Sequence, residues 1–490
     1  MLSFLKNKPI FLFLLPFFFV LHGFTEYLDQ VPVKDALWLL LLYTVASIVL
    51  TGLFWLFFHD LTRSSLAAFC VMVFHFFFGT VQDLFKNNFP GAFISRYSFI
   101  LPFSLLLFII IIVWLKKRKK PFTKIIAYLN ILLLVLSAVD MARLVSKTLG
   151  VKEDINITLS KKGLHPCNNC NKPDIYFIIL DEYTGNTALR DQYDFDNTSF
   201  ETALTQKGFH VVKESQSNYN STPYSVASTL NMNYLQLDMK TENAGNLNYC
   251  YRSIADNIVL KFLKAEGYRF FNYSIFDFPH HPAINHDSFL PANTRFITSQ
   301  TFLGRVRKDI RFNIINGKWN CRPLLKKFTA GHLHNNENFL KLTKNSATQK
   351  SQRFIYTHLM MPHAPYYFDS KGNPAPLEKL VEAHAGKEKD YVEYLQYCNK
   401  KILEMAEYIL ASSPEPPVIM LLGDHGGRRF KNPVADKYYF LNLNAIYLPG
   451  KNYNAFYDSM SSVNLFRVLF NEQFQQQIPL LKDSTVYLWK

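Results

Sequence analysis

Residues 418–426 have the sequence VIMLLGDHG, in which five apolar residues lead into a glycine, a carboxylate, an imidazole and a second glycine. A short, wholly apolar run bounded by glycine is typical of a strand that is buried on both faces, as in a parallel sheet. The glycines allow the backbone to turn there without a Cβ clash. The stretch therefore predicts a buried strand whose tip presents Asp424 and His425 side by side.

Four other parts of the chain repeat this strand signal. Residues 174–180 (DIYFIIL) are the clearest, and they end abruptly in Asp181 and Glu182. Ligands of open parallel sheets bind beyond the carboxyl ends of the strands, so acidic residues at strand tips are candidates for chemistry. The predicted strands are 174–180, 268–276, 353–360, 418–422 and 443–448.

Helical stretches alternate with these strands, and two of them end at Gly208 and Gly267, which suit helix C-caps. Strands that alternate with helices predict an α/β domain with a largely parallel sheet that is covered by helices on both faces. The predicted helices are 198–207, 254–266, 377–412 and 461–473.

The first 144 residues have a different character, with 13 basic and 6 acidic side chains among long apolar runs. A helix needs about 20 apolar residues to cross the hydrocarbon of a bilayer. We therefore expect a bundle of about five transmembrane helices, and a wholly soluble protein is excluded. A cleaved signal peptide is not expected, because no small-residue cleavage site follows the first run. The apolar runs are 9–25, 36–58, 66–81, 97–115 and 125–139.

Basic residues at 116–120 and Lys124 form a block between the fourth and fifth runs. The positive-inside rule then places the N-terminus inside and everything after residue 145 outside. We expect a multi-pass protein of the plasma (inner) membrane with a transmembrane domain (1–144), a linker (145–172) and an extracytoplasmic catalytic domain (173–490). Much of the net charge of +15 belongs to the membrane flanks, so no nucleic-acid partner is expected.

The six cysteines include one close pair, Cys167 and Cys170 in CNNC. No second CxxC motif is present to complete a four-ligand zinc site. Outside the cytoplasm the pair favours a short-loop disulfide, although the spacing does not establish the bond.

Candidate metal ligands lie at the two strand tips. Asp424 and His425 offer oxygen and nitrogen, which suit Zn²⁺ or Mn²⁺ better than Mg²⁺. Asp181 supplies a second carboxylate at an equivalent position, and Glu182 is the alternate. The simpler interpretation is that both acids cap a turn after the strand.

Thr222 and His363 are the candidates for catalysis. Pro223 suits the first helical position, which would make Thr222 the N-cap beside free backbone N–H groups, a favourable place for phosphate. Its hydroxyl needs a metal or a base to become a nucleophile, and the simpler interpretation is that it only caps a helix. His363 lies between Pro362 and Pro365 in a constrained loop, which favours phosphate binding or proton transfer. His358 is an alternate, and we expect surface positions for His280, His281, His332, His334 and His384.

In their order along the chain, Asp181, Thr222, His363 and the Asp424-His425 pair resemble the alkaline phosphatase/sulfatase superfamily. With five spans ahead of one outer domain, the chain looks like the lipoteichoic acid synthases and the lipid A phosphoethanolamine transferases. The resemblance implies an alkaline phosphatase-like domain with one divalent metal ion, held by Asp181, Thr222, Asp424 and His425. It also implies that Thr222 is the nucleophile and that His363 contacts the phosphoryl group.

Two departures from the family pattern affect this assignment. The membrane transferases carry Glu at the first ligand position, where this chain has Asp181 followed by Glu182. Residues 221–225 (STPYS) approach the sulfatase pattern C/S-x-P-x-R, but Ser225 stands where the arginine belongs. This mismatch counts against sulfate-ester hydrolysis, leaves Ser221 as the alternate nucleophile and makes Ser225 a candidate substrate contact.

The resemblance implies a transferase that moves a phosphoethanolamine or phosphoglycerol group from a membrane phospholipid to a glycan or lipid acceptor of the cell envelope. A covalent threonine intermediate would link the two steps. One alternative is a sulfatase-like hydrolase of phosphodiesters, phosphate esters or sulfate esters, with water as the acceptor. A second alternative is a non-catalytic membrane-anchored binding protein. The head group, the acceptor and the oligomeric state are left open.

Overall fold

The computed structural model describes residues 2–28, 30–89, 91–149, 155–237, 243–284, 290–349, 352–381, 388–428, 430 and 433–488, so His384 lies outside the described residues. The chain divides into two compact units. Unit 1 comprises Met1–Lys152 and His286–Ile310, and unit 2 comprises Glu153–Asn285 and Arg311–Lys490. The second segment of unit 1 lies in the part of the sequence that we had assigned wholly to the outer domain.

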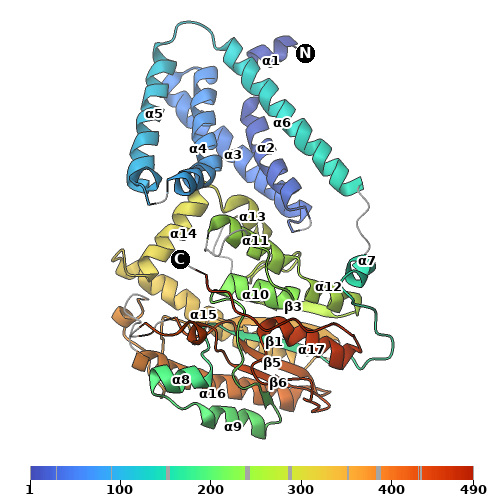
Figure 1. Cartoon of the computed structure of the whole chain (residues 1–490). Coiled ribbons are helices and arrows are strands. Elements are labelled where there is room, and N and C mark those ends of the chain that lie inside the picture. The colour runs from blue at the N-terminus through green and yellow to red at the C-terminus, as the bar shows by residue number, and fades with distance from the viewer. Residues whose placement is uncertain are drawn as a thin grey trace. The chain divides into compact units, whose positions relative to one another are not determined.

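Unit 1 contains the apolar helices, which run from dark blue to cyan in Figure 1. Four of them are long and apolar enough to cross a membrane, and α2 is apolar but shorter. The expected bundle of about five helices is confirmed. Polar flanks extend α4 and α6 to 28 and 27 residues, beyond the apolar runs seen in the sequence. The helices are α1 (Leu2–Asn7), α2 (Phe11–Glu26), α3 (Val33–Phe58), α4 (Leu61–Asn88), α5 (Tyr97–Lys117) and α6 (Thr123–Leu149).

The apolar side chains of α5 face outward. Ile100 and Leu115 are its buried residues, while Leu107 and Ile110 leave 50% and 55% of their surface exposed. Soluble proteins rarely expose continuous apolar surfaces of this kind. The exposure is consistent with a helix whose surroundings are hydrocarbon.

The second segment of unit 1 contains η2 (Ala292–Thr294), α13 (Arg295–Thr298) and the first part of α14 (Phe302–Ile315). It bonds to the apolar helices through polar groups. The Asn293 amide donates to Asp35 at 2.9 Å, and the Gly79 N–H donates to the Gln300 carbonyl at 2.8 Å. These contacts join residues more than two hundred positions apart, which is why the sequence pattern did not reveal them.

Unit 2 contains a six-stranded sheet in the order β2-β6-β5-β1-β4-β3. The four strands β5, β1, β4 and β3 are parallel, and β6 and β2 pair antiparallel at one edge. The predicted largely parallel sheet is therefore confirmed, and only the two-residue β2 was too short to predict. The strands are β1 (Ile175–Leu180), β2 (His210–Val211), β3 (Arg269–Tyr273), β4 (Arg353–Leu359), β5 (Val418–Gly423) and β6 (Asn444–Tyr447).

Helices cover both faces of this sheet, as expected. Alternate side chains of β1 enter different apolar cores, with Phe177 in one and Ile178 in the other. The Phe177 core is covered by α10 (Thr222–Asn231), α11 (Ala244–Ala255), α12 (Ile258–Ala265) and α17 (Ser462–Phe474). The Ile178 core is covered by α8 (Asn186–Tyr193), α9 (Thr198–Gln206), α15 (Arg322–Ser346) and α16 (Glu388–Ser412).

Some predicted helix boundaries were wrong. The helix expected at 254–266 is divided between α11 and α12, because the Asn257 side chain accepts from the Leu260 N–H at 2.7 Å and starts a new helix. In the region 377–412, a short 3₁₀ turn at Leu377–Lys379 is followed by α16 only from Glu388. The long helix α15 was not predicted.

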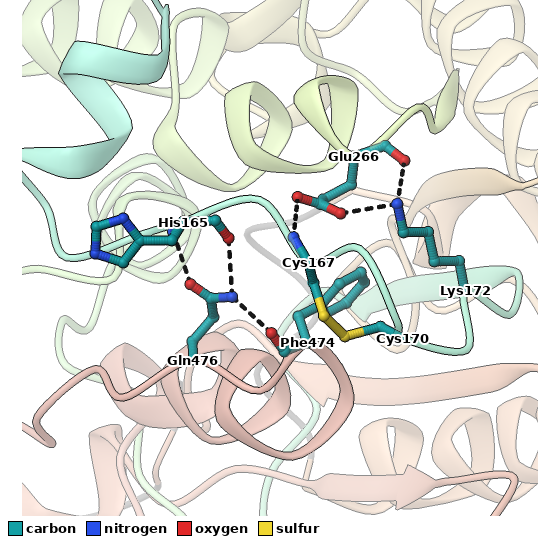
Figure 2. Close-up of a disulfide and its surroundings, with 7 residues drawn as sticks. All are labelled: His165, Cys167, Cys170, Lys172, Glu266, Phe474 and Gln476. Carbon is teal, nitrogen blue, oxygen red and sulfur yellow. Dashed lines mark hydrogen bonds and ion pairs between the residues drawn. A yellow bond between two sulfur atoms is a disulfide. The ribbon is translucent and has the colours of Figure 1, made fainter.

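The segment expected as a linker contains α7 (Ile155–Ser160) and the disulfide Cys167–Cys170, which confirms the favoured interpretation of that pair. Figure 2 shows how the segment is held to unit 2. The Glu266 carboxylate accepts from the Cys167 N–H at 3.1 Å and pairs with Lys172 at 2.9 Å. Residues near the bridge are thus part of the packed structure of unit 2.

Candidate active site

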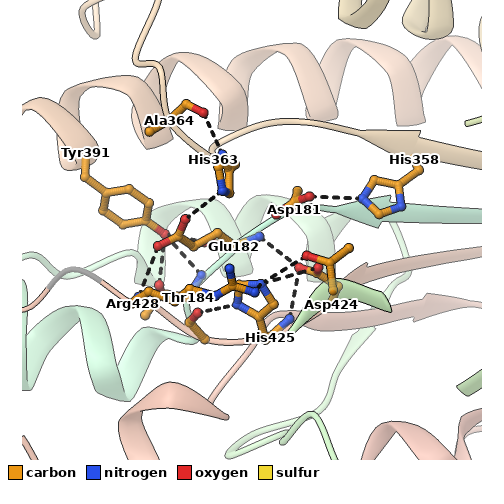
Figure 3. Close-up of polar contacts among 12 residues, drawn as sticks. Asp181, Glu182, Thr184, His358, His363, Ala364, Tyr391, Asp424, His425 and Arg428 are labelled. Atoms are coloured by element: carbon orange, nitrogen blue, oxygen red, sulfur yellow. Dashed lines mark hydrogen bonds and ion pairs between the residues drawn. The ribbon is translucent and has the colours of Figure 1, made fainter. Parts of the chain in front are cut away.

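The tips of β1 and β5 lie side by side because Leu180 pairs with Gly423 in register. Asp181 and Asp424 therefore leave adjacent strands at the same edge of the sheet. The ligand atoms of Asp181, Asp424 and His425 all lie within 4.8 Å of one another, and each residue is at most 1% exposed. We call these three residues the strand-tip cluster (Figure 3).

The glycines around this motif are required by close backbone contacts. A Cβ on Gly423 would lie 2.4 Å from the Tyr183 carbonyl oxygen, and one on Gly426 would lie 2.4 Å from the Tyr438 carbonyl oxygen. Any larger residue at either position would displace the turn that carries Asp424 and His425.

His425 is held as a neutral ring with a defined tautomer. Its Nδ1 lies 2.7 Å from the Gly426 carbonyl oxygen, which can only accept, so Nδ1 carries the hydrogen. Burial, with the nearby Arg428 charge adding, lowers the pKa of His425 to about 3. The unprotonated Nε2 therefore carries a lone pair, and it lies 3.3 Å from the Thr222 hydroxyl and 3.5 Å from Asp424 Oδ2.

Thr222 reaches the strand-tip cluster from the start of α10. The helix begins at Thr222, and the N-cap is Ser221, so our assignment of Thr222 as the N-cap was wrong by one residue. Pro223 therefore occupies the second helical position instead of the first. This costs no hydrogen bond, because the N–H groups of the first helical positions have no partner within the helix and proline has no N–H. The Thr222 hydroxyl does not cap α10 and instead contacts His425.

The two carboxylates are incompletely satisfied. Asp424 Oδ1 accepts from the backbone N–H groups of Glu182 at 2.9 Å and His425 at 3.0 Å. Asp181 Oδ1 and Asp424 Oδ2, by contrast, are buried without a hydrogen-bond partner among the described residues. Burial and the charge of Asp181 raise the pKa of Asp424 above its usual range. Two buried acids that repel each other, each with one oxygen that lacks a partner, form a site that favours a cation.

His358 orients Asp181. It is fully buried in β4, and its Nε2 lies 3.2 Å from Asp181 Oδ2. Although burial opposes ionisation, the charge of His363 and the hydrogen bond with His358 keep the pKa of Asp181 below its usual range. The structure thus places the alternate His358 behind a carboxylate, with Asp181 between it and the rest of the cluster (Figure 3).

Glu182 points away from the strand-tip cluster. Its Oε1 accepts from the Arg428 N–H at 3.0 Å, and its Oε2 lies 3.6 Å from His363 Nε2. Its backbone has a positive φ of 60°, so the chain turns at Glu182 and the side chains of Asp181 and Glu182 point in different directions. The fold therefore brings Asp181 into the cluster and directs Glu182 toward His363.

His363 lies in the loop after β4, where its backbone N–H donates to the Asp181 carbonyl at 3.0 Å. Its side chain is 16% exposed, so the ring is accessible beside the buried cluster. Ser221, the N-cap of α10, and Ser225 within α10 are also buried, but no hydrogen bond of the described residues joins either hydroxyl to the cluster.

Sequence analysis missed two residues near this site. Arg428 lies two residues beyond GDHG, and its Nη2 is 2.6 Å from His425 Nε2; the GGRR sequence after the motif was the available signal. His332 of α15 was expected at the surface but is partly buried. Burial lowers its pKa to about 3, with the charges of Arg311 and His363 adding to the effect. No local pattern in the sequence indicated this position.

No protein-family model matches the chain, and no curated protein matches it. Among solved structures, it is similar to the C-terminal periplasmic domain of EcEptC from Escherichia coli, with 13% identity, a TM-score of 0.40, and coverage of 67% of this chain and 94% of that chain. It is also similar to lipooligosaccharide phosphoethanolamine transferase A (EptA) from Neisseria meningitidis, with 11% identity, a TM-score of 0.39, and coverage of 96% and 95%. A third is the phosphonate monoester hydrolase of Agrobacterium radiobacter, with 11% identity, a TM-score of 0.37, and coverage of 62% and 74%.

These neighbours are members of the groups that the motifs resemble. With TM-scores of 0.40 or lower, however, the similarity carries no argument about which residues act or on what substrate. The case for a function rests on the contacts of this chain's own side chains.

Proposed function

We propose that the protein is a membrane-anchored, metal-dependent phosphotransferase. It moves a phospho-alcohol group, of the phosphoethanolamine or phosphoglycerol type, from a phospholipid to a glycan or lipid acceptor of the cell envelope. The observation that supports this proposal is the convergence of the Thr222 hydroxyl with two buried, incompletely satisfied carboxylates around Nε2 of His425.

The residues suit one divalent cation. Asp181, Thr222, Asp424 and His425 would hold it, and their mixture of oxygen and nitrogen favours Zn²⁺ or Mn²⁺ over Mg²⁺. A bound cation of this kind lowers the pKa of a nearby hydroxyl and offsets negative charge on a phosphoryl group. It would also compensate the repulsion between the two acids.

Thr222 is the nucleophile in this proposal. Its hydroxyl gives up its proton to solvent as the oxygen attacks the phosphorus of the donor lipid. The bond from phosphorus to the diacylglycerol oxygen breaks, and a phosphothreonine ester remains. The N-terminal N–H groups of α10 point toward the same place and favour the negative charge of the phosphoryl group. An acceptor hydroxyl then displaces Thr222 from phosphorus and regenerates the free side chain.

His363 protonates the diacylglycerol oxygen as it leaves. Its ring is accessible, and the Glu182 carboxylate lies 3.6 Å from its Nε2. The fully buried His358 has a positioning role, because it holds one oxygen of Asp181 and leaves the other unpartnered.

A membrane anchor suits such a reaction, because the chain is confined to the bilayer that contains its donor. In this proposal the basic block at 116–120 lies in the cytoplasm, and unit 2 lies on the outer side of the plasma membrane. Protease added to intact cells should then cleave unit 2, and complete protection under conditions of proven access would contradict this topology.

Mass spectrometry of the full chain after incubation with phosphatidylethanolamine or phosphatidylglycerol tests the covalent step. We expect a mass increment on the peptide that contains Thr222, and its size identifies the transferred group. Thr222→Ala should abolish the increment, whereas Thr205→Ala, a surface threonine of α9, should retain it. An unmodified Thr222 peptide during proven turnover would overturn the threonine mechanism.

The same experiment separates transfer from hydrolysis. If the labelled chain is isolated and an acceptor is then added, transfer predicts that the label appears on the acceptor. Release of the free phospho-alcohol at the same rate with and without acceptor would instead identify a hydrolase.

A further inference from the structure

Arg428 is a cationic side chain within the proposed metal site. Its Nη2 lies 2.6 Å from His425 Nε2, and its backbone N–H donates to Glu182 Oε1 at 3.0 Å. Its Nε is buried and has no hydrogen-bond partner among the described residues. Figure 3 shows Arg428 beside the imidazole of His425.

One lone pair is shared in this arrangement. His425 Nδ1 donates to the Gly426 carbonyl, so Nε2 is the acceptor nitrogen of the ring. Arg428 has only N–H donors, and it therefore donates to Nε2. An imidazole nitrogen has a single in-plane lone pair, which can accept this hydrogen bond or coordinate a metal ion, but not both at once.

The charge of Arg428 also opposes the binding of a metal ion. The guanidinium is always protonated, and it donates to His425 Nε2, which lies 3.5 Å from the buried carboxylate oxygen Oδ2 of Asp424. It supplies part of the positive charge that Asp181 and Asp424 require. A divalent cation that enters the cluster must therefore displace the guanidinium from His425 and overcome its repulsion.

We propose that Arg428 competes with the divalent cation for His425 Nε2, and that the displaced guanidinium binds the phosphoryl oxygens of the substrate. The second half rests on the proposed function. Arg428 thus has two successive partners, the imidazole in the metal-free chain and the substrate anion in the loaded one.

The position of the side chain supports the second step. Arg428 Nη2 and the Thr222 hydroxyl are both within hydrogen-bond distance of the same imidazole nitrogen, so a group that reacts at Thr222 lies within reach of the guanidinium. The contact from its backbone N–H to Glu182 fixes the start of the side chain while the far end changes partner. A guanidinium presents a planar set of donors that matches phosphate oxygens, and its unpartnered Nε remains available.

Metal affinity tests the competition. The full chain is freed of metal and titrated with Zn²⁺, and the dissociation constant is measured by calorimetry for wild type, R428A and R428K. We expect R428A to bind Zn²⁺ at least about tenfold more tightly than wild type, while R428K, which keeps the charge, lies between them. Arg190→Ala, which removes an exposed arginine of α8, should leave the affinity unchanged. Loss of folding cannot imitate this result, because a disordered site binds more weakly.

The outcomes separate this inference from the proposed function. Equal or weaker Zn²⁺ binding by R428A, with wild type binding normally, overturns the competition and leaves the proposed metal site intact. If neither protein binds any Zn²⁺ or Mn²⁺, both proposals are overturned. If only R428A binds, Arg428 excludes the cation from the isolated chain, which supports the competition.

Steady-state kinetics with saturating metal test the substrate contact. We expect R428A to raise KM for the phospholipid donor at least about tenfold and R428K to restore part of the loss, because a single charged hydrogen-bond donor to phosphate is removed. If R428A binds the metal ion more tightly and the phospholipid more weakly than wild type, Arg428 exchanges one partner for the other. An unchanged KM for R428A would overturn the substrate half of the proposal.

Discussion

Helix α5 in unit 1 and the strand-tip cluster in unit 2 depart from the pattern of a soluble protein in opposite directions. On α5, Leu107 and Ile110 leave half of their surface exposed, whereas in the cluster Asp181 and Asp424 are almost completely buried. Burial of apolar surface and exposure of charge are the usual preferences in water. Each departure therefore indicates that something other than water completes the surroundings.

The two regions require different surroundings. Exposed leucines along a whole helix require a continuous apolar environment, and the length of α5 matches a bilayer. Two buried acids with unpartnered oxygens require a local charge of opposite sign, which a single ion or guanidinium provides. The cluster should therefore depend on positive charge, and α5 on a hydrocarbon environment.

Asp424→Asn should have the largest effect. Loss of one anionic ligand should lower turnover on the order of a thousandfold, equivalent to about 4 kcal/mol of transition-state stabilisation. The measurement is release of the lipid head group together with the metal content of the purified chain. Asp436→Asn, at an exposed carboxylate, is the control and should retain activity. A variant at Asp424 that keeps both its metal and its rate would remove the basis of the proposed site.

Leu107→Arg should come next, because Leu107 lies at the centre of α5. Arginine at the middle of a transmembrane helix costs about 3 kcal/mol in insertion. The expected result is a clear loss of membrane-integrated protein, measured by fractionation. Leu480→Arg is the matched control, since Leu480 in unit 2 is 44% exposed against 50% for Leu107. Equal effects at the two positions would contradict the assignment of α5 to hydrocarbon.

His332→Asn should alter how stability depends on pH. Burial keeps His332 neutral in the folded chain with a pKa of about 3, whereas the unfolded side chain gains a proton near pH 6.5. Stability from the neutral form is complete above pH 6.5 and declines as the pH falls toward 3. Wild type should lose about 2.5 kcal/mol more than the variant between pH 7 and pH 4.5, as measured by denaturant midpoints.

The exposed His334 of the same helix provides the control for that measurement. His334→Asn should show the wild-type dependence on pH. If wild type and His332→Asn lose stability in parallel, the neutral state of His332 in the folded chain is not responsible for the decline.

Replacement of Cys167 and Cys170 by serine should have the smallest effect. The bridge closes a short loop, so its removal should lower the free energy of unfolding by about 2 kcal/mol. Chemical unfolding of the full chain measures the change. Cys321→Ser, at a free cysteine, should not alter stability appreciably, and reductant should destabilise the wild type but not the double variant.

Much of the candidate site could be predicted from the sequence because its acidic residues lie at strand tips. A buried run followed by Asp181 and another followed by Asp424 predicted two carboxylates at one edge of a parallel sheet. What could not be predicted was that β1 and β5 are neighbours in register, since every strand in the prediction was a candidate neighbour. That pairing decided which carboxylates meet.

Other contacts could not be predicted from the sequence, for a related reason. Arg428 is close to His425 in sequence, but only the turn formed by the glycines brings its guanidinium back to the ring. The contact between Asn293 and Asp35 spans 258 positions and depends on two polar side chains without a pattern around them. His332 of α15 is partly buried near the charges of Arg311 and His363, a position that no local periodicity describes.

The amino-acid order alone determined the apolar helices, most of the strands and the candidate residues at the strand tips, because hydrophobic periodicity and strand ends are properties of short stretches. Tertiary structure decided which acid faces the cluster, that Ser221 rather than Thr222 caps α10, and that an arginine shares the imidazole of His425. These outcomes depend on strand register and on turns that set distances of a few ångströms between residues far apart in the chain. Such distances arise only when the whole domain packs.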